Sequence, residues 1–165
     1  MSRFLVNNFC KYCSTYNGIR LNVILSLSSL PPLSLSLCLP PLSLSVEFVC
    51  DAVADVAFIV DSSGSIGRRN WRKMLDFLNE MVKAFNVGAD KTHIAVVAYS
   101  NNAIAEIKFN TLTGSSVTEE EYKRLINRIR FQRGFTFIDK ALLLADREVF
   151  TTAAGMRPEL PQVLS

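Results

Sequence analysis

The chain from Asp55 onward shows two patterns of hydrophobic and polar positions. Nearly continuous apolar runs cover residues 56–60 and 93–99, which is typical of strands whose two faces are both buried. Between and after these runs, apolar residues recur every three or four positions, as on one face of a helix. A strand, a helix and a second strand in this order predict an open α/β sheet.

Three segments carry the helical spacing. The first follows Gly67 and is expected to end at Gly88, because glycine commonly follows a helix C-terminus. The second begins at Thr118, which forms a capping box with Glu121 three residues later. The third follows Phe137. The apolar residues expected on the buried faces are Trp71, Met74, Leu75, Leu78, Val82 and Phe85 in the first segment, Tyr122, Leu125, Ile126 and Ile129 in the second, and Ile138, Ala141, Leu142, Ala145 and Val149 in the third.

The segment after residue 99 predicts a hairpin. Asn101-Asn102 is a tight-turn pair, and residues 103–109 then alternate between apolar and polar positions, which indicates an antiparallel strand near the edge of the sheet. The last residues, 163–165, read as the start of a further strand. An open-sheet fold does not usually end at such a point.

Residues 1–46 differ from the rest of the chain. The sequence Pro-Pro-Leu-Ser-Leu-Ser at 31–36 returns at 40–45, and such repetition marks low complexity. A basic start before the apolar stretch 19–30 fits a secretory signal, and translated non-coding sequence explains the repeat equally well. Two Pro-Pro pairs disfavour a transmembrane helix. We therefore expect a disordered leader at 1–46 and one incomplete domain at 47–165.

The net charge of +3 belongs to this leader. Only Arg3, Lys11 and Arg20 of the 18 basic residues precede Glu47, and none of the 15 acidic residues does, so the remainder carries 15 of each. A balanced domain has no overall electrostatic attraction to nucleic acid or to an anionic membrane. Neither is expected as a partner.

A polar loop begins where the first apolar run ends. Its sequence is Asp61-Ser62-Ser63-Gly64-Ser65-Ile66-Gly67, and ligands of open α/β sheets lie at the carboxyl ends of strands. Asp61, Ser63 and Ser65 stand at alternate positions, so their oxygens can converge on one side. One carboxylate with several hydroxyls suits Mg²⁺ or Mn²⁺, which take about six oxygen ligands. An acidic group from another protein can complete the coordination of such a cation.

Two further stretches accompany this loop: the apolar run with its following serine, 94–100, and the loop 134–142, Gly-Phe-Thr-Phe-Ile-Asp-Lys-Ala-Leu. Together with residues 54–67 they resemble the von Willebrand factor A domains, the family of integrin inserted domains, matrilins and the A-type modules of non-fibrillar collagens. The resemblance implies a Rossmann-like sheet of six strands with helices on both faces. In that sheet the strand at 56–60 would be central and would lack one neighbour, which would leave the isolated chain marginally stable or prone to aggregate. It also implies a metal-ion-dependent adhesion site in which Thr136 joins Asp61, Ser63 and Ser65.

The sequence departs from the family pattern in two places. Phe135, Ile138 and Asp139 replace the usual second glycine, second threonine and final glycine of the Gly-Gly-Thr-x-Thr-Gly-x-Ala-Leu loop. The family's last metal-site aspartate belongs to an Asp-Gly pair beyond the next strand, and the present sequence ends at Ser165. Asp139 is interpreted as a surface carboxylate and not as a substitute for that aspartate.

The resemblance implies a secreted, non-enzymatic adhesion module that binds a matrix or cell-surface protein, collagen-like or acidic, through Mg²⁺ or Mn²⁺. A serine hydrolase is the rival enzyme hypothesis, because Ser63-Gly64-Ser65-Ile66-Gly67 approaches the Gly-x-Ser-x-Gly nucleophile motif. Ser63 replaces its first glycine, and the one histidine, His93, lies within an apolar strand pattern. A non-functional or purely structural gene fragment is the remaining alternative.

Overall fold

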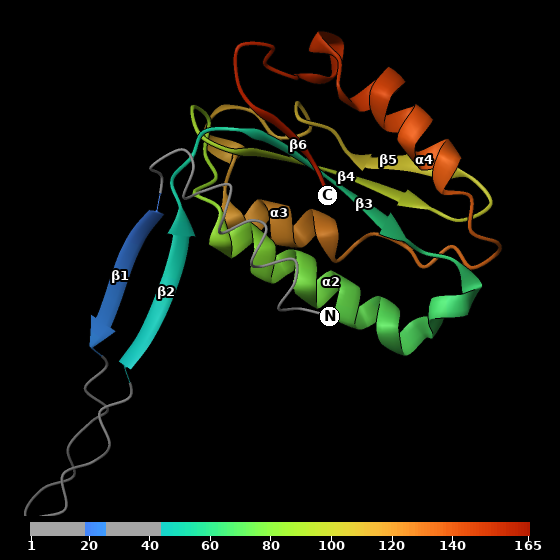
Figure 1. The fold of residues 1–165 in the computed structure, drawn as a ribbon, viewed down its shortest axis with the longest axis horizontal. Coiled ribbons are helices and arrows are strands. Elements are labelled where there is room, and N and C mark those ends of the chain that lie inside the picture. The colour runs from blue at the N-terminus through green and yellow to red at the C-terminus, as the bar shows by residue number, and fades with distance from the viewer. Residues whose placement is uncertain (1–18, 26–43) are drawn as a thin grey trace, which may run out of the picture.

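The structure is a computed structural model that describes residues 19–25 and 44–165. In the first part of the chain, strands β1 (Ile19–Leu25) and β2 (Leu44–Cys50) pair in antiparallel register and form a two-stranded sheet of their own. Figure 1 shows this pair projecting away from the remaining elements. Most of the predicted leader lies outside the described residues, and the division of the chain at residue 46 stays a prediction. Within the described ranges, no helix is both long and apolar enough to cross a membrane.

The main sheet has four strands in the order β5-β4-β3-β6. The strands β3 and β4 are parallel, as are β3 and β6, whereas β5 is antiparallel to β4 and lies at the edge. The predicted open α/β sheet with one antiparallel edge strand is therefore confirmed. The bounds of the strands are Asp55–Asp61 for β3, His93–Tyr99 for β4, Ala103–Ile107 for β5 and Gln162–Leu164 for β6.

Helices cover both faces of this sheet, as the family resemblance implied (Figure 1). Helices α2 (Gly67–Ala84) and α3 (Glu119–Ile126) lie on one face, and α4 (Ile138–Leu144) lies on the other. Alternate residues of the central strands point to opposite layers. The first layer is a core of large side chains that includes Val56, Phe58, Val60, Trp71, Leu78, Val82, Ile94, Val96, Tyr122 and Ile126. The second layer contains Ala57, Ala95, Val97, Tyr99, Ala141, Ala145 and Val149.

Two helix boundaries test the predicted caps. Thr118 precedes α3, and its hydroxyl accepts the Glu121 N–H at 3.3 Å, which confirms the predicted start of that helix. The prediction that Gly88 ends the first helix is wrong. Helix α2 ends at Ala84, and Phe85 already has extended backbone. Gly88 instead belongs to the following turn, in which its carbonyl accepts the Lys91 N–H at 3.1 Å.

The predicted buried face of α4 is also partly wrong. Ala141 is fully buried, but Ile138 and Leu142 are 53% and 46% exposed. The small residues decide which side of this helix faces the sheet, because Ala141 and the following Ala145 pack closely on Ala57 and its neighbours in the second layer. Close approach of backbones requires small side chains at the contact, so the larger ones are turned outward.

The expectation that β3 lacks one neighbour is wrong as well. The predicted strand at the end of the chain forms as β6, and it pairs with β3 from Asp55 to Ala57. Two backbone hydrogen bonds extend this pairing, from Ser165 N–H to the Ala57 carbonyl at 2.9 Å and from Ile59 N–H to the Ser165 carbonyl at 2.8 Å. The central strand therefore has partners on both sides along its first half.

Candidate metal centre

Strand β3 delivers Asp61 to the carboxyl edge of the sheet. The chain then turns through a short 3₁₀ helix, η1 (Gly64–Ile66), into α2. An Asp61 carboxylate oxygen accepts the Ser63 N–H at 2.7 Å, a local bond that aspartate commonly makes in turns. This bond closes the first part of the loop and orients the Asp61 side chain toward the serines.

The two predicted serine ligands are neighbours. Ser63 Oγ and Ser65 Oγ are 2.9 Å apart. That distance is a hydrogen bond, and it is also the separation of two adjacent oxygens of an octahedron, about 2.9 Å, when each lies about 2.0–2.1 Å from Mg²⁺. The residue types and the spacing of the hydroxyls therefore fit a small, oxygen-liganded divalent cation. Ser63 is buried and Ser65 is exposed, so the hydrogen-bonded pair lies at the boundary between the interior and solvent.

A second loop lies against the first through two backbone hydrogen bonds. The Gly64 N–H donates to the Gly134 carbonyl at 2.9 Å, and the Arg133 N–H donates to the Ser62 carbonyl at 2.9 Å. Thr136 follows two residues after this junction and is exposed. Within the described part of the chain no hydrogen bond joins Thr136 to the three residues of the first loop. The structure thus brings the two loops together, and ligation by all four residues stays a prediction.

A third loop, at the end of β4, supports the other two. Ser62 is fully buried, and both its N–H and its hydroxyl donate to the Tyr99 carbonyl, at 2.8 and 2.9 Å. Asn101 accepts the Phe135 N–H at 2.8 Å through its side-chain oxygen. The sequence predicted Asn101 only as a turn residue, since a cross-loop bond between residues 34 positions apart leaves no local pattern. Ser62 and Asn101 are the supporting residues that sequence reasoning missed.

The electrostatics of the site come from one carboxylate. Burial raises the pKa of the Tyr99 phenol, and the nearby charge of Asp61 raises that pKa further. Among the described residues no group of three or more His, Cys, Asp and Glu side chains could hold a metal. The oxygens that the first loop offers are therefore one carboxylate, from Asp61, and the hydroxyls of Ser63 and Ser65.

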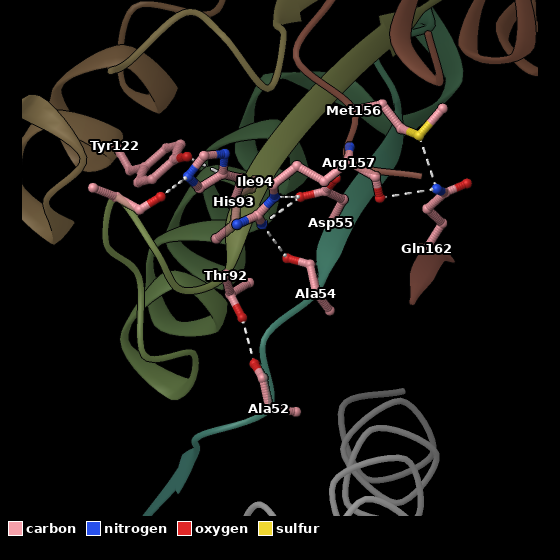
Figure 2. Close-up of polar contacts among 11 residues, drawn as sticks. Ala52, Ala54, Asp55, Thr92, His93, Ile94, Tyr122, Met156, Arg157 and Gln162 are labelled. Carbon is pink, nitrogen blue, oxygen red and sulfur yellow. Dashed lines mark hydrogen bonds and ion pairs between the residues drawn. The ribbon is translucent and has the colours of Figure 1, made fainter. Parts of the chain in front are cut away.

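The opposite end of the parallel strands, where β3 and β4 begin, holds a different polar cluster (Figure 2). Asp55, at the start of β3, is fully buried and forms an ion pair with Arg157, which donates from Nε at 2.9 Å and from its backbone N–H at 2.7 Å. Beside this pair, the Tyr122 hydroxyl accepts the Ile94 N–H at 3.0 Å. A carboxylate at the first position of an apolar strand was the available signal for this cluster in the sequence.

His93 lies at this same end of the strands, beside Asp55, and not near Ser65. The register pairs His93 with Asp55 and Tyr99 with Asp61, so the histidine and the serine loop are separated by the length of the strands, about 20 Å. His93 Nε2 is 3.0 Å from the Ala89 carbonyl. The structure therefore does not bring the histidine to Ser65, as the hydrolase alternative requires.

The protein belongs to the class of open α/β sheets that carry a hydroxyl-rich loop after the central strand. Residues 55–164 match the model of the von Willebrand factor type A domain. Because this match spans more than half of the chain, the chain belongs to the von Willebrand factor type A domain family, as the sequence resemblance indicated.

The relatives include proteins of the extracellular matrix. Human collagen alpha-1(XX) chain is 33% identical over 127 residues, which cover 77% of this chain and 9% of that protein. Rat von Willebrand factor is 30% identical over 113 residues, which cover 68% of this chain and 25% of that protein. The chain thus spans a quarter or less of the length of these two relatives.

Solved structures of proximal thread matrix protein 1 from the mussel byssus share the fold. One has a TM-score of 0.64 at 26% identity and covers 70% of this chain and 30% of the mussel protein. Another, described as having a zinc-occupied MIDAS motif, has a TM-score of 0.61 at 29% identity and covers 70% of this chain and 28% of that protein.

Proposed function

We propose that this chain is a divalent-cation-dependent adhesion module, in which Asp61, Ser63, Ser65 and Thr136 hold Mg²⁺ or Mn²⁺ at the carboxyl edge of the sheet. The observation that carries the proposal is the 2.9 Å separation of the Ser63 and Ser65 hydroxyls beside the Asp61 carboxylate. The zinc-occupied MIDAS motif of the mussel relative supports it.

Each of the four residues has a separate role in the proposed site. Asp61 supplies the one negative charge, the two serines supply neutral oxygens, and Thr136 adds a hydroxyl from the loop held by Gly134. When bound, the cation would act as an electrophile that accepts a carboxylate oxygen from the partner. The partner we propose is a secreted matrix or cell-surface protein, collagen-like or acidic, because the named relatives are collagen chains and von Willebrand factor.

Calorimetric titration of the full chain with MgCl₂ tests the metal site. Asp61→Ala is expected to abolish binding and Thr136→Ala to weaken it, whereas Thr136→Ser, which keeps the hydroxyl, retains it. Asp139→Ala is the matched control, because Asp139 is an exposed carboxylate in the first turn of α4. An equal loss of affinity in Asp61→Ala and Asp139→Ala would contradict the assignment.

Adhesion is tested on surfaces coated with collagen. Binding of the full chain is expected in Mg²⁺, and it is lost in EDTA and in Asp61→Ala. Binding that is unchanged in EDTA would overturn the metal-dependent mechanism.

A further inference from the structure

The strand pair β1–β2 divides apolar and polar residues between its two faces. Residues directly opposite each other in an antiparallel pair share a face, and successive residues along a strand alternate between the faces. The register therefore places four of the seven residue pairs on one face and three on the other. We define the β1–β2 face by the first four pairs, which are all apolar: Ile19 with Cys50, Leu21 with Phe48, Val23 with Val46, and Leu25 with Leu44.

The other face of this pair carries the polar positions. Its three pairs are Arg20 with Val49, Asn22 with Glu47, and Ile24 with Ser45. Both charged residues of the two strands, Arg20 and Glu47, belong to this face, where they stand at diagonal positions with opposite charges. The β1–β2 face has no charged position. Such an alternation is typical of a sheet with one face in water and the other packed on a partner.

Two strands are too few to cover such a face by themselves. An isolated pair is marginally stable in water, and it needs further strands or another packing partner. The strands β1 and β2 form a sheet of their own, and Figure 1 shows them extending away from the main sheet. The main sheet is covered by α2 and α3 on one face and by α4 on the other. These described elements pack with one another, which leaves the β1–β2 face to another partner.

Area and charge favour a second copy of the chain as this partner. Burial of one aliphatic residue removes roughly 60–120 Å² of apolar surface from water, so the eight positions supply roughly 500–900 Å² per copy. A specific interface buries about 800 Å² per partner. Two such faces packed together, with Arg20 and Glu47 outward, form a small β-sandwich. A lipid surface fits less well, because interfacial segments are basic on their polar face, whereas the charges of Arg20 and Glu47 cancel.

We propose that the β1–β2 pair is a dimerisation element, in which the β1–β2 faces of two copies of this chain pack on each other. This inference goes beyond the proposed function and requires no metal. Residues 51–54 join β2 to the Asp55 end of β3, whereas the Asp61 loop follows the other end of that strand (Figure 1). The dimer therefore leaves both Asp61 loops free. Two linked binding sites raise the avidity for a surface without any new contact.

Analytical ultracentrifugation of the full chain at about 1–100 μM tests the interface. EDTA and a reductant are present, so that neither a metal nor a disulfide holds the copies together. The parent chain is expected to form a dimer. Val46→Lys places a charge in the β1–β2 face and is expected to raise the dissociation constant of the dimer at least about hundredfold. Val49→Lys is the matched control and leaves the constant unchanged, because Val49 lies three positions along the same strand and belongs to the polar face.

Complementary charges distinguish a lost interface from strands that fail to form. A mixture of Val46→Lys and Val46→Glu is expected to restore the dimer that each variant alone lacks, because a two-fold axis through the middle of the face brings equivalent positions of the two copies together.

Four results would overturn the inference. They are a mixture that stays monomeric, a parent chain that is monomeric throughout, equal weakening by Val46→Lys and Val49→Lys, and a monomeric parent chain that binds phosphatidylserine vesicles, which would make the β1–β2 face a lipid-binding surface. A dimer that forms in a chain without Mg²⁺ affinity would overturn the proposed function alone and leave this inference in place.

Discussion

The two ends of strand β3 place the same residue type in opposite surroundings. Asp55 is fully buried and receives three donors from Arg157, two of them from its side chain. Asp61 is half-buried and receives the N–H of Ser63, two residues along its own loop. A buried carboxylate must be matched by donors within the fold, whereas a carboxylate at an open edge keeps lone pairs for a ligand. The first end therefore serves the stability of the fold, and the second end carries the proposed binding site.

Breaking the buried Asp55–Arg157 ion pair is expected to have the largest effect on stability. Arg157→Met leaves the Asp55 carboxylate buried without its partner and is expected to lower the free energy of unfolding by about 3–5 kcal/mol. Asp61→Asn, at the other end of the strand, is expected to change it by less than about 1 kcal/mol in EDTA. Urea unfolding followed by circular dichroism measures both.

The double variant Asp55→Leu/Arg157→Met is the control for this prediction. It removes both charges together, so it is expected to recover part of the stability that Arg157→Met loses. Equal destabilisation by Arg157→Met and Asp61→Asn would break the comparison, because it would mean that both ends serve the fold alike.

A substitution at Gly134 tests the Asp61 end of β3, and its expected effect on stability is smaller. Its φ angle is 98°, and a Cβ there would lie 2.8 Å from the Asn101 side chain. Gly134→Ala is expected to cost about 1–2 kcal/mol for the positive φ alone and more for this overlap, and to lower the Mg²⁺ affinity because the Thr136 loop moves. The measurements are urea unfolding and calorimetric titration.

Gly114→Ala is the matched control for Gly134. Gly114 also has a positive φ angle, 55°, but nothing lies within 4 Å of its added Cβ. It should lose stability through the dihedral angle and keep its Mg²⁺ affinity. If both variants bind Mg²⁺ like the parent chain, the contact between the two loops does not position the metal ligands.

The local patterns of the sequence predicted the elements well where they depend on neighbouring residues. The run at 93–99 became β4 with those same bounds, and the hairpin after it became the antiparallel edge strand β5. The polar loop after β3 lies at the carboxyl edge, as the strand–loop–helix order predicted. These features follow from periodicity and turn chemistry, which a single sequence displays directly.

The contacts that join distant residues could not be predicted in this way. Arg157 and Asp55 are 102 positions apart, and neither residue's surroundings in the sequence indicate the other. The outward orientation of Ile138 and Leu142 has a similar origin, because a broad apolar face does not reveal which of its residues meet the sheet. In both cases packing against the assembled sheet decides the outcome.

The smallest expected effect is the pH dependence of stability that comes from His93, at the Asp55 end of the strands. Burial lowers the pKa of His93 below its ordinary value of 6.5, and the charge of Arg157 lowers it further, against the opposing effect of Asp55. The folded chain therefore binds a proton at His93 less tightly than the unfolded chain does. The stability that depends on neutral His93 is present above about pH 6.5 and is lost as the pH falls through the lower pKa of the folded state.

Urea unfolding between pH 8 and pH 5 measures this dependence in the parent chain and in His93→Gln. The variant keeps a donor for the Ala89 carbonyl, which lies 3.0 Å from His93 Nε2, and it has no titrating ring. Its stability is expected to fall less steeply below pH 6.5. The carboxylates titrate in both proteins, so the difference between the two curves isolates the histidine. Parallel curves would show that neither burial nor the charge of Arg157 lowers the pKa of His93, and that the Asp55–Arg157 pair stabilises this end of the strand without pH coupling in this range.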